Sequence, residues 1–540
     1  MDQFDQLLTA ARAAYTRGNW YGAYSQLSHA RTLADLGSDD LSLLGSSAWW
    51  VGRVKESLGI SEEVYHRLHN DGDAAGAAMK ALNVALVWFI RGDLVIASGW
   101  VNRARGLLQE LPEGQELGYL RYLEAALAMD YTNLQPTREA AVELKELGRR
   151  LQAPALTSFG LVLSGLADAR TGRTVAGFAQ LDEAMLPVLA GQLQPEWAGE
   201  IYCIIIHACY DLGDVHRMRA WTRATEQWCE QFSGEVVYSG ICRIHRLQLV
   251  SIEGGWEEAA HGIEQSGSDL VGRNNWVAGE AFYQLGEIRR LQGDTVGAQT
   301  AYNQARGLGT DPQPGESLLQ LTAGKSDAAW AALCAALVGR DRLACARLLQ
   351  SAVEVALALG LVAEAERLCA QLEDTAETFA TAGFRAWAGQ ARAAVLLTQG
   401  QYDDAVPVLQ GAAREYRAMH ARYETGRVYE QLAQAHRGMG RAAAASSDTA
   451  TALAIYRELG AAPDIYRLDG GSLPGGLTPR EAEVLAFIAA GATNKGAAEA
   501  LFISQKTVGR HLANIFLKIG VSSRTAAAAW AHDHGVRQHG

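Results

Sequence analysis

The sequence predicts an all-α protein, with a long array of helical hairpins followed by a small four-helix domain at the carboxyl end. Three observations carry this prediction. A glycine-centred pattern recurs along residues 1–460, no convincing pattern of parallel strands appears, and the segment from residue 477 onward reads as short helices with recognisable caps. With 540 residues, 49% of them hydrophobic and 20% charged, the chain is long enough for several cores.

The repeated unit is a helical stretch with small residues and an aromatic, then a glycine, a polar or aromatic residue and, soon afterwards, an alanine. Glycine accepts the positive φ at the end of the first helix, and alanine lets the second helix approach closely. Successive glycines are 74, 80, 41, 41, 39, 67, 40 and 40 residues apart, so the period is about 40 and each of the three long intervals spans two units. Eleven or twelve hairpins are therefore expected. The predicted turn glycines are Gly18, Gly92, Gly172, Gly213, Gly254, Gly293, Gly360, Gly400 and Gly440.

A single hairpin leaves one apolar face in water, so such units stack into a superhelix with a concave binding surface. Residues 1–460 resemble a tetratricopeptide array of the long-repeat kind found in bacterial regulators. The resemblance implies a sensor or interaction domain that binds an effector or a partner protein. An irregular connection is expected at residues 310–321, where Pro312 and Pro314 break helical continuity.

Residues 461–476 are predicted to form a linker. Their sequence, AAPDIYRLDGGSLPGG, contains two prolines and four glycines and has no helical period. The chain is thereby divided into a repeat domain at 1–460, the linker, and a carboxyl-terminal domain at 477–540.

The carboxyl-terminal domain consists of a series of capped helices. Residues 478–481, Thr-Pro-Arg-Glu, form a capping box with proline at the first helical position and predict a helix that ends at Gly491. Thr493 caps a second, short helix, and Ser504 caps a third helix that is closed by Gly520. A fourth helix follows in the sequence SSRTAAAAWA.

The third of these helices has one apolar and one polar face. Its apolar residues form one stripe that we expect to be buried, namely Val508, Leu512, Ile515, Phe516 and Ile519. The residues that point the other way are Lys506, Arg510, Ala513 and Asn514. Two short helices followed by such a helix describe a helix-turn-helix, in which the last helix enters the major groove of DNA.

About 55 consecutive residues of this domain resemble the LuxR-type DNA-binding domain in the motifs LT-x-RE-x-EVL, G-x-TNK, LFIS-x-KTV, HL-x-NI and K-x-GV-x-SRT-x-A. The resemblance implies double-stranded DNA as a partner and a homodimer on that DNA, paired through the fourth helix. The alanines at 526–529 suit a close contact between two such helices, or they simply favour the helix by their high propensity.

The resemblance also implies which residues contact DNA. Those at or near phosphates are Lys495, Ser504, Lys506, Thr507 and Lys518, where positive charge and hydroxyls at helix N-termini suit the contact. Arg510 and Asn514 face the bases, and Arg510 can make a bidentate contact to guanine O6 and N7. The family usually has a basic residue in place of Gly509 and often a polar one in place of Ala513, so base reading is expected to depend on Arg510.

A further departure from the family concerns the stability of the second helix. After Asn-Lys the family has Glu-Ile-Ala, whereas this chain has Gly-Ala-Ala at 496–498. The change removes the capping-box glutamate, a core isoleucine and about 1 kcal/mol of helix propensity at the glycine. We therefore expect the second helix to be marginally stable.

The two domains carry charges of opposite sign. Residues 472–540 contain seven basic and four acidic residues, a net charge of +3, so the net charge of −12 for the whole chain leaves −15 on the remainder. A flexible tether would keep the basic domain close to the acidic array. The array is therefore expected to mask the DNA-binding face, or the helix that pairs two domains, until an effector binds.

Weaker motifs predict neither a cofactor nor a metal. The Gly-Lys-Ser at 324–326 looks like the end of a phosphate-binding loop, but the first glycine of that loop would fall on Leu319, so a hairpin turn is the better interpretation and the ATPase domain of large LuxR-type regulators is not expected. Two pairs of residues have a spacing that would suit zinc, namely Cys203 with His207 and Cys242 with His245. The first pair lies in an apolar helix, and we predict core residues instead.

We therefore predict a sequence-specific DNA-binding transcriptional regulator whose repeat domain binds an effector or partner protein and controls the helix-turn-helix. The alternative is a tetratricopeptide interaction scaffold with a degenerate, non-specific DNA-binding domain, which Gly509 and Ala513 would favour. An enzyme is not expected, because no nucleophile, base and orienting group can be named from spacing. The apolar stretches are too short for a membrane span and the first residues resemble no secretory signal, so we expect a cytoplasmic location and no membrane partner.

Overall fold

The computed structural model describes residues 3–230, 237–469, 474–477, 479–501, 503–534 and 536. In these residues the secondary structure is helical, with 29 α-helices, one short 3-10 helix and no β-strand. The predicted all-α class is confirmed. None of the described helices is both long and apolar enough to cross a membrane.

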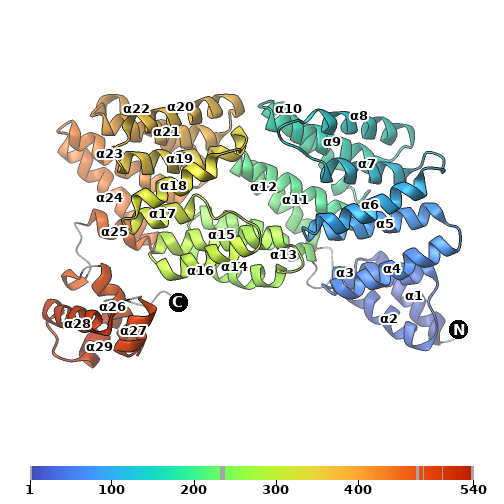
Figure 1. The fold of residues 1–540 in the computed structure, drawn as a ribbon, viewed down its shortest axis with the longest axis horizontal. Helices are drawn as coiled ribbons and strands as arrows, with labels where there is room; N and C mark the ends of the chain where they lie inside the picture. The colour runs from blue at the N-terminus through green and yellow to red at the C-terminus, as the bar shows by residue number, and fades with distance from the viewer. Residues whose placement is uncertain are drawn as a thin grey trace.

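The array consists of twelve consecutive hairpins in the described residues, within the predicted range (Figure 1). The first six are α1 (Gln3–Thr16) with α2 (Trp20–Leu33), α3 (Ser38–Trp50) with α4 (Val54–Asn70), α5 (Ala74–Ile90) with α6 (Leu94–Leu108), α7 (Gln115–Leu127) with α8 (Gln135–Arg150), α9 (Pro154–Arg170) with α10 (Thr174–Leu189), and α11 (Pro195–Asp211) with α12 (Val215–Glu230). The other six are α13 (Val237–Ile252) with α14 (Trp256–Leu270), α15 (Asn275–Gln292) with α16 (Thr295–Gly307), α17 (Gly315–Thr322) with α18 (Ser326–Leu337), α19 (Arg342–Ala358) with α20 (Val362–Phe379), α21 (Ala382–Thr398) with α22 (Tyr402–Met419), and α23 (Arg422–Gly438) with α24 (Ala442–Leu459).

The hairpin turns follow the predicted glycines. All nine have a positive φ, between 64° and 96°, and each lies between the two helices of one hairpin. Two of the three long intervals contain a further turn glycine, Gly52 after α3 and Gly324 after α17. The third contains the glycine-free turn between α7 and α8. The Gly-Lys-Ser at 324–326 is therefore part of a hairpin turn, as predicted.

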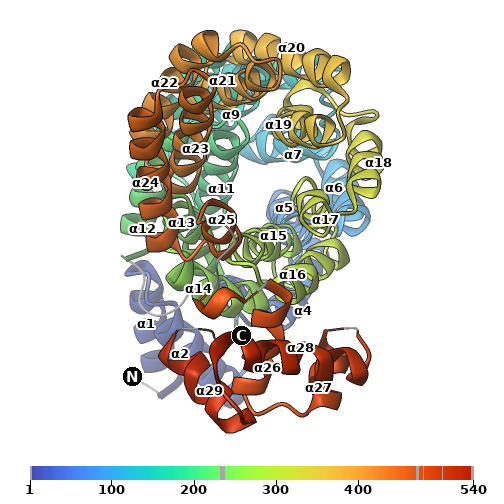
Figure 2. The same ribbon diagram turned by 90° about the vertical axis from the view of Figure 1, so that its left-hand side faces the viewer.

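The hairpins wind around a common axis, which Figure 2 shows end-on. Contacts between distant helices hold this curvature: the Trp50 indole N–H on α3 donates to Glu196 on α11 (3.0 Å), and the Trp197 indole N–H donates to Asn83 on α5 (3.1 Å). One large cluster of buried apolar residues extends through the array from Trp20 to Ala461, and three smaller clusters of described residues lie beside it. Stacking thus supplies the core that one hairpin cannot form alone.

The predicted linker contains a short helix, α25 (Ala462–Leu468), which packs against α24 and α15. Pro463 lies in its first turn, where the missing backbone N–H costs no helical hydrogen bond, so this proline permits the helix. Residues 469–473 alone separate α25 from the next helical element. The tether between the domains is therefore shorter than the composition of the segment predicts, and the domain boundaries themselves stay a prediction.

The carboxyl-terminal domain has a core of its own. Its elements are η1 (Pro474–Gly476), α26 (Pro479–Ala489), α27 (Asn494–Ala500), α28 (Gln505–Ile519) and α29 (Arg524–Asp533). The apolar residues that form this core are Leu477, Val484, Leu485, Ile488, Ala497, Ala498, Leu501, Val508, Leu512, Ile515, Ala527 and Ala531. Thr478, the first residue of the predicted capping box, lies outside the described residues.

Candidate nucleic-acid interface

The position of α28 is set by a cap at each end and by one apolar stripe. The Ser504 hydroxyl accepts a hydrogen bond from the Thr507 amide (3.1 Å), and Gly520 ends the helix with a φ of 69°, both as predicted. The predicted stripe packs on the domain core and comprises Val508, Leu512, Ile515, Phe516 and Ile519. These contacts fix which face of the helix is left to solvent.

The solvent face of α28 presents polar side chains that have no partner among the described residues. Its exposed residues include Lys506, Arg510, Ala513 and Asn514. Within the described part of the chain, no hydrogen bond or ion pair engages the side chains of Lys506, Arg510 or Asn514. Free donors on one exposed helix face are what readout of base edges in a major groove requires.

The N-terminus of α28 adds two hydroxyl groups to this face. The hydroxyls of Ser504 and Thr507 lie 2.7 Å apart, Ser504 is exposed and Thr507 is half-buried. The positive end of the helix dipole and these hydroxyls suit a phosphate oxygen, and Lys506 lies between them in the sequence.

The two remaining predicted lysines have different surroundings. The Lys495 side chain on α27 is 72% exposed and lies 3.9 Å from Glu499. In contrast, the Lys518 ammonium is 2.6 Å from the carboxylate of Glu481, whose side chain is only 5% exposed, so this ion pair joins α28 to α26. Lys495 is exposed and forms only a long surface ion pair, so it can reach a phosphate, whereas Lys518 already neutralises a buried carboxylate.

The turn before α27 is held by the last helix of the domain. The Thr493 hydroxyl caps α27 by accepting from the Gly496 amide (3.1 Å), as predicted. Arg524 at the start of α29 donates to Asn494 Oδ1 (2.7 Å) and to the Ala492 carbonyl. The sequence predicted the cap but not the hydrogen bonds of Arg524, because the turn before α27 and the start of α29 meet only in the folded domain.

Leu517 also lies on the exposed face and was missed by the sequence analysis. Its side chain is 83% exposed and it follows Arg510 by seven residues, two helical turns. The sequence contained the signal for this, because a residue seven positions after Arg510 lies on the same face of the helix and therefore outside the buried stripe. An exposed leucine there can contact a thymine methyl group.

The alanines of α29 serve partly as core. Ala527 and Ala531 are fully buried within the domain, whereas Ala529 is exposed. Trp530 is half-buried and stacks on His534 with ring centroids 4.0 Å apart. Pairing of two domains through this helix stays a prediction.

The two cysteine–histidine pairs in the array differ from one another. His245 is buried and hydrogen-bonds to Gln248 (3.1 Å), as expected for a core residue. His207 is not a core residue: its side chain is 29% exposed and forms a contact of 3.2 Å with Asp211. The side chain of Cys242 lies outside the described residues.

Residues 476–531 match the family described as "Bacterial regulatory proteins, luxR family". Over 56 residues the chain is 55% identical to transcriptional regulatory protein LiaR of Bacillus subtilis (strain 168), a match that covers 10% of this chain and 26% of that protein. Over 58 residues it is 50% identical to the CsgBAC operon transcriptional regulatory protein of Escherichia coli (strain K12), with 11% and 27% covered. The chain thus spans about a quarter of the length of these relatives.

A solved structure described as a Rap protein complexed with competence and sporulation factor is similar in shape, at 12% sequence identity and a TM-score of 0.38, with 71% of this chain and 99% of that chain covered. A likeness at this level carries no argument about this chain, and the repeat fold rests on the hairpins themselves. The family match, the capped helices and the exposed face of α28 together identify residues 476–531 as a LuxR-family helix-turn-helix domain, joined here to a tetratricopeptide-like helical array.

Proposed function

We propose that this protein is a cytoplasmic, sequence-specific transcriptional regulator that binds double-stranded DNA as a homodimer and is controlled by an effector of its helical array. The observation that carries the proposal is the exposed polar face of α28, where Lys506, Arg510 and Asn514 have no partner in the described chain. Lys495, Ser504, Thr507 and Lys518 complete the proposed contacts, with phosphates rather than bases. LiaR and the CsgBAC operon protein are regulators by name, and both match over this domain.

Control by the array is supported by the way α25 is attached to it. The Tyr423 hydroxyl donates to Asp464 (3.1 Å), and Arg467 forms an ion pair with Glu430. The base of the tether is therefore held by side chains of α23, and a shift of the last hairpins moves the point from which the DNA-binding domain departs. In the structure the face of α28 is exposed, so control acts through this placement or through the pairing of two domains.

The experiment is a selection of DNA fragments by the full-length protein, followed by the same selection with Arg510→Ala. We expect an enriched two-fold symmetric motif, and we expect the variant to lose roughly 1–3 kcal/mol on it and to lose discrimination at one base pair per half-site. The matched control is Arg17→Ala, which removes an exposed arginine from the array.

Two outcomes would contradict the proposal. Uniform recovery of fragments by the unaltered protein would favour the alternative, an interaction scaffold with a degenerate DNA-binding domain. The small residues Gly509 and Ala513 are the sequence feature that favours this alternative. An unchanged motif for Arg510→Ala would show that another residue reads the bases.

A further inference from the structure

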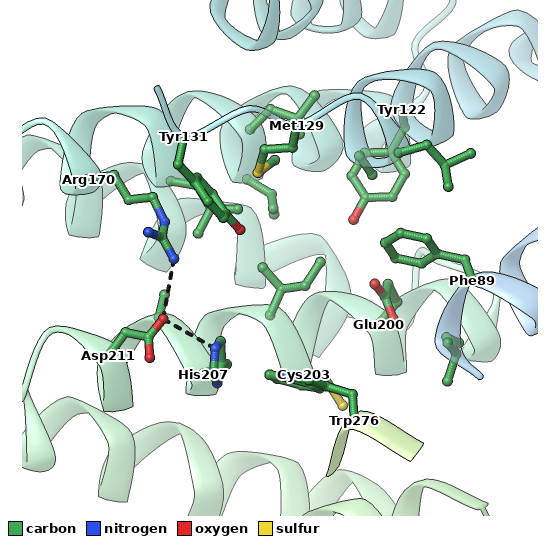
Figure 3. Close-up of a pocket in the computed structure, with 18 of the residues that line it drawn as sticks. Phe89, Tyr122, Met129, Tyr131, Arg170, Glu200, Cys203, His207, Asp211 and Trp276 are labelled. Atoms are coloured by element: carbon green, nitrogen blue, oxygen red, sulfur yellow. Dashed lines mark hydrogen bonds and ion pairs between the residues drawn. The ribbon is translucent and has the colours of Figure 1, made fainter. Parts of the chain in front are cut away.

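A cavity of about 470 Å³ lies inside the first half of the array. It is lined by residues of α5, α7, α9 and α11, and the first turn of α15 borders it. Most of the lining is apolar, and Figure 3 shows the rings of Phe89, Tyr122, Tyr131 and Trp276 around it. Small-molecule sites have roughly this volume (about 300–1,000 Å³), with apolar walls and a few polar groups that orient the ligand.

Two polar groups in this cavity have no hydrogen-bond or ion-pair partner among the described residues. Glu200 on α11 is 7% exposed, its carboxylate points into the cavity, and no hydrogen bond or ion pair reaches it from the described residues (Figure 3). The Tyr122 hydroxyl on α7 is directed into the same space and is also buried without a hydrogen-bond partner among those residues. Buried polar groups are normally hydrogen-bonded, so an unpaired carboxylate and phenol from two facing helices indicate a ligand group that joins them.

The charged groups at the other end of the cavity satisfy one another. Arg170 lies 3.4 Å from Asp211 and 3.3 Å from Asp341, and its guanidinium stacks on Tyr131 at 3.6 Å from the ring centroid. The same Asp211 is 3.2 Å from His207. Because these charges are paired, Glu200 is the charged group of the described lining that is left for a ligand.

The chemistry of the Glu200 end favours a cation. Burial raises the pKa of Glu200 to about 7, and no positive charge of the described residues offsets this effect by stabilising the carboxylate. A ligand ammonium would supply that charge and donate hydrogen bonds to both the carboxylate and the Tyr122 oxygen. Phe89 and Tyr122 also present aromatic rings there, and ring faces attract organic cations.

We propose that this cavity binds a small organic amine, with its ammonium group on Glu200 and Tyr122 and its apolar body along the walls toward Trp276. That this amine is the effector of the array rests on the regulatory function proposed above. The assignment of the cavity itself rests only on the unpaired groups and on the apolar, aromatic lining.

One helix connects the cavity with the base of the tether. The side chain of Asn274, which lines the cavity, caps the start of α15 by accepting from the Val277 amide (3.1 Å). The same helix ends at Gly293, where an added Cβ would lie 3.3 Å from Pro463 of α25. A ligand against Trp276 thus touches one end of a helix whose other end contacts α25, and so it can bias the position of the DNA-binding domain.

The first test is calorimetric titration of the full-length protein at pH 8 with primary amines. The probes are the alkylamines from butylamine to octylamine together with 2-phenylethylamine and 4-phenylbutylamine, each compared with its matching alcohol. We expect at least one amine to bind with a stoichiometry of one and its alcohol to bind at least tenfold more weakly. The proposal fails if no amine binds at millimolar concentration or if the alcohols bind equally well.

The second test assigns the site. Glu200→Gln keeps the shape of the side chain but removes its charge, so we expect at least a tenfold loss of affinity for the amine and little change for the alcohol. Tyr122→Phe should weaken the amine less, and Glu183→Gln, on the exposed surface of α10, should leave binding unchanged. Circular dichroism verifies that each variant is folded. Unaltered amine binding by Glu200→Gln would overturn the assignment.

The third readout is the proton released on binding. Among the described residues, the ionisable groups that Glu200 affects are Tyr122 on α7 and Cys203 on α11, and Cys229 on α12 lies close to Cys203. Burial raises the pKa of both Tyr122 and Cys203, so these two stay neutral between pH 6 and 8. At pH 6 Glu200 must give up a proton to pair with the ammonium, so affinity should rise about tenfold from pH 6 to pH 8. This rise should be absent in Glu200→Gln. Subtracting the pH dependence of the variant from that of the unaltered protein removes what the other charged groups contribute, namely Cys229 and, at the far end of the cavity, Arg170, His207 and Asp211.

Finally, the affinity of the full-length protein for its selected DNA is measured with and without the bound amine. We expect a change of at least fivefold. Amine binding with unchanged DNA affinity would refute the effector role but keep the cavity assignment, and DNA binding without any amine binding would refute this inference but keep the proposed function.

Discussion

Lys506 and Arg510 are one helical turn apart on the same exposed face of α28, yet the two side chains are expected to do different work. A lysine ammonium is a compact point charge that suits a phosphate, whereas the planar arginine fork matches guanine O6 and N7. Because their neighbours Gly509 and Ala513 are small, few other side chains on this face can compensate for the loss of either DNA contact.

Lys506→Ala is predicted to weaken binding to all DNA sequences alike. Each domain brings to the DNA the positive charges of Lys495, Lys506 and Arg510, and that of Lys518 if it leaves Glu481. A dimer therefore places about 6 to 8 positive charges against the DNA, which gives a slope of log K against log salt near −5 to −7. The variant should make this slope shallower by about 1 per domain, and Lys55→Ala on the array serves as the control. A slope shallower than about −2 for the unaltered domain would refute the phosphate contacts.

Glu200→Gln is predicted to stabilise the array more at pH 8 than at pH 5. The folded carboxyl keeps its proton up to about pH 7, whereas the unfolded one releases it near its ordinary value of 4.5, so folding stability falls as the pH rises through this window. The pKa shift corresponds to about 3 kcal/mol of folding free energy, of which roughly 2–3 kcal/mol is lost between pH 5 and pH 8. Thermal unfolding of both proteins at the two pH values measures it, and an equal gain at both would contradict the burial of an unpaired carboxyl.

At the scale of single elements, α27 is the helix of the DNA-binding domain that we expect to be marginally stable. It has seven residues, its N-cap is Thr493, and its third helical residue, Gly496, lacks the side chain that would complete a capping box. An added Cβ at Gly496 would meet only Thr493 Oγ1 at 3.6 Å and Ala492 Cβ at 3.9 Å, both ordinary contacts. The position is therefore open to a larger residue.

Gly496→Glu is predicted to raise the stability of the domain by about 1–2 kcal/mol, through helix propensity and through a hydrogen bond from the Thr493 amide to the new carboxylate. Gly496→Ala provides the matched control, because it adds the propensity of about 1 kcal/mol without the capping box. Urea unfolding of residues 472–540 compares the three proteins. Equal stability of the glutamate and alanine variants would show that the box does not form.

At the scale of the whole molecule, the charge of −15 outside residues 472–540 is held close to a domain of +3 by a short connection between α25 and η1. The array repels DNA phosphates that approach the domain and attracts the basic residues that would bind them. Both effects lower the affinity of the full chain for DNA, and both are screened by salt.

The full-length protein is therefore predicted to bind its selected DNA at least tenfold more weakly, per domain, than the fragment 472–540 does. The difference should shrink as the salt concentration rises from 50 to 300 mM, and it should shrink when the bound amine is added. Gel-shift titrations of both proteins on one DNA duplex measure it. Equal affinities in the absence of effector would leave masking by the array without support.

The sequence by itself determined the hairpins, their turns and the caps of the DNA-binding domain, because glycines at positive φ, N-cap hydroxyls and apolar stripes act within one helix or one turn. Gly213, for example, has the positive φ of a hairpin turn, and Ser504 accepts the hydrogen bond that caps α28. The exposed face of α28 was predictable for the same reason, since burial of Val508 and Ile515 leaves only one direction for Arg510.

The tertiary structure alone decided the contacts between helices that are distant in the chain. Lys518 is predicted as a phosphate ligand from its place in the motif, yet it lies against Glu481, 37 residues away. Glu200 lies in an apolar helix that the sequence predicts to be part of the core. It becomes a candidate ligand-binding group because α7 places the Tyr122 hydroxyl in the same cavity. Helix periodicity specifies which side of a helix is buried, whereas the curvature of the stacked hairpins decides which buried sides meet and where they leave a space.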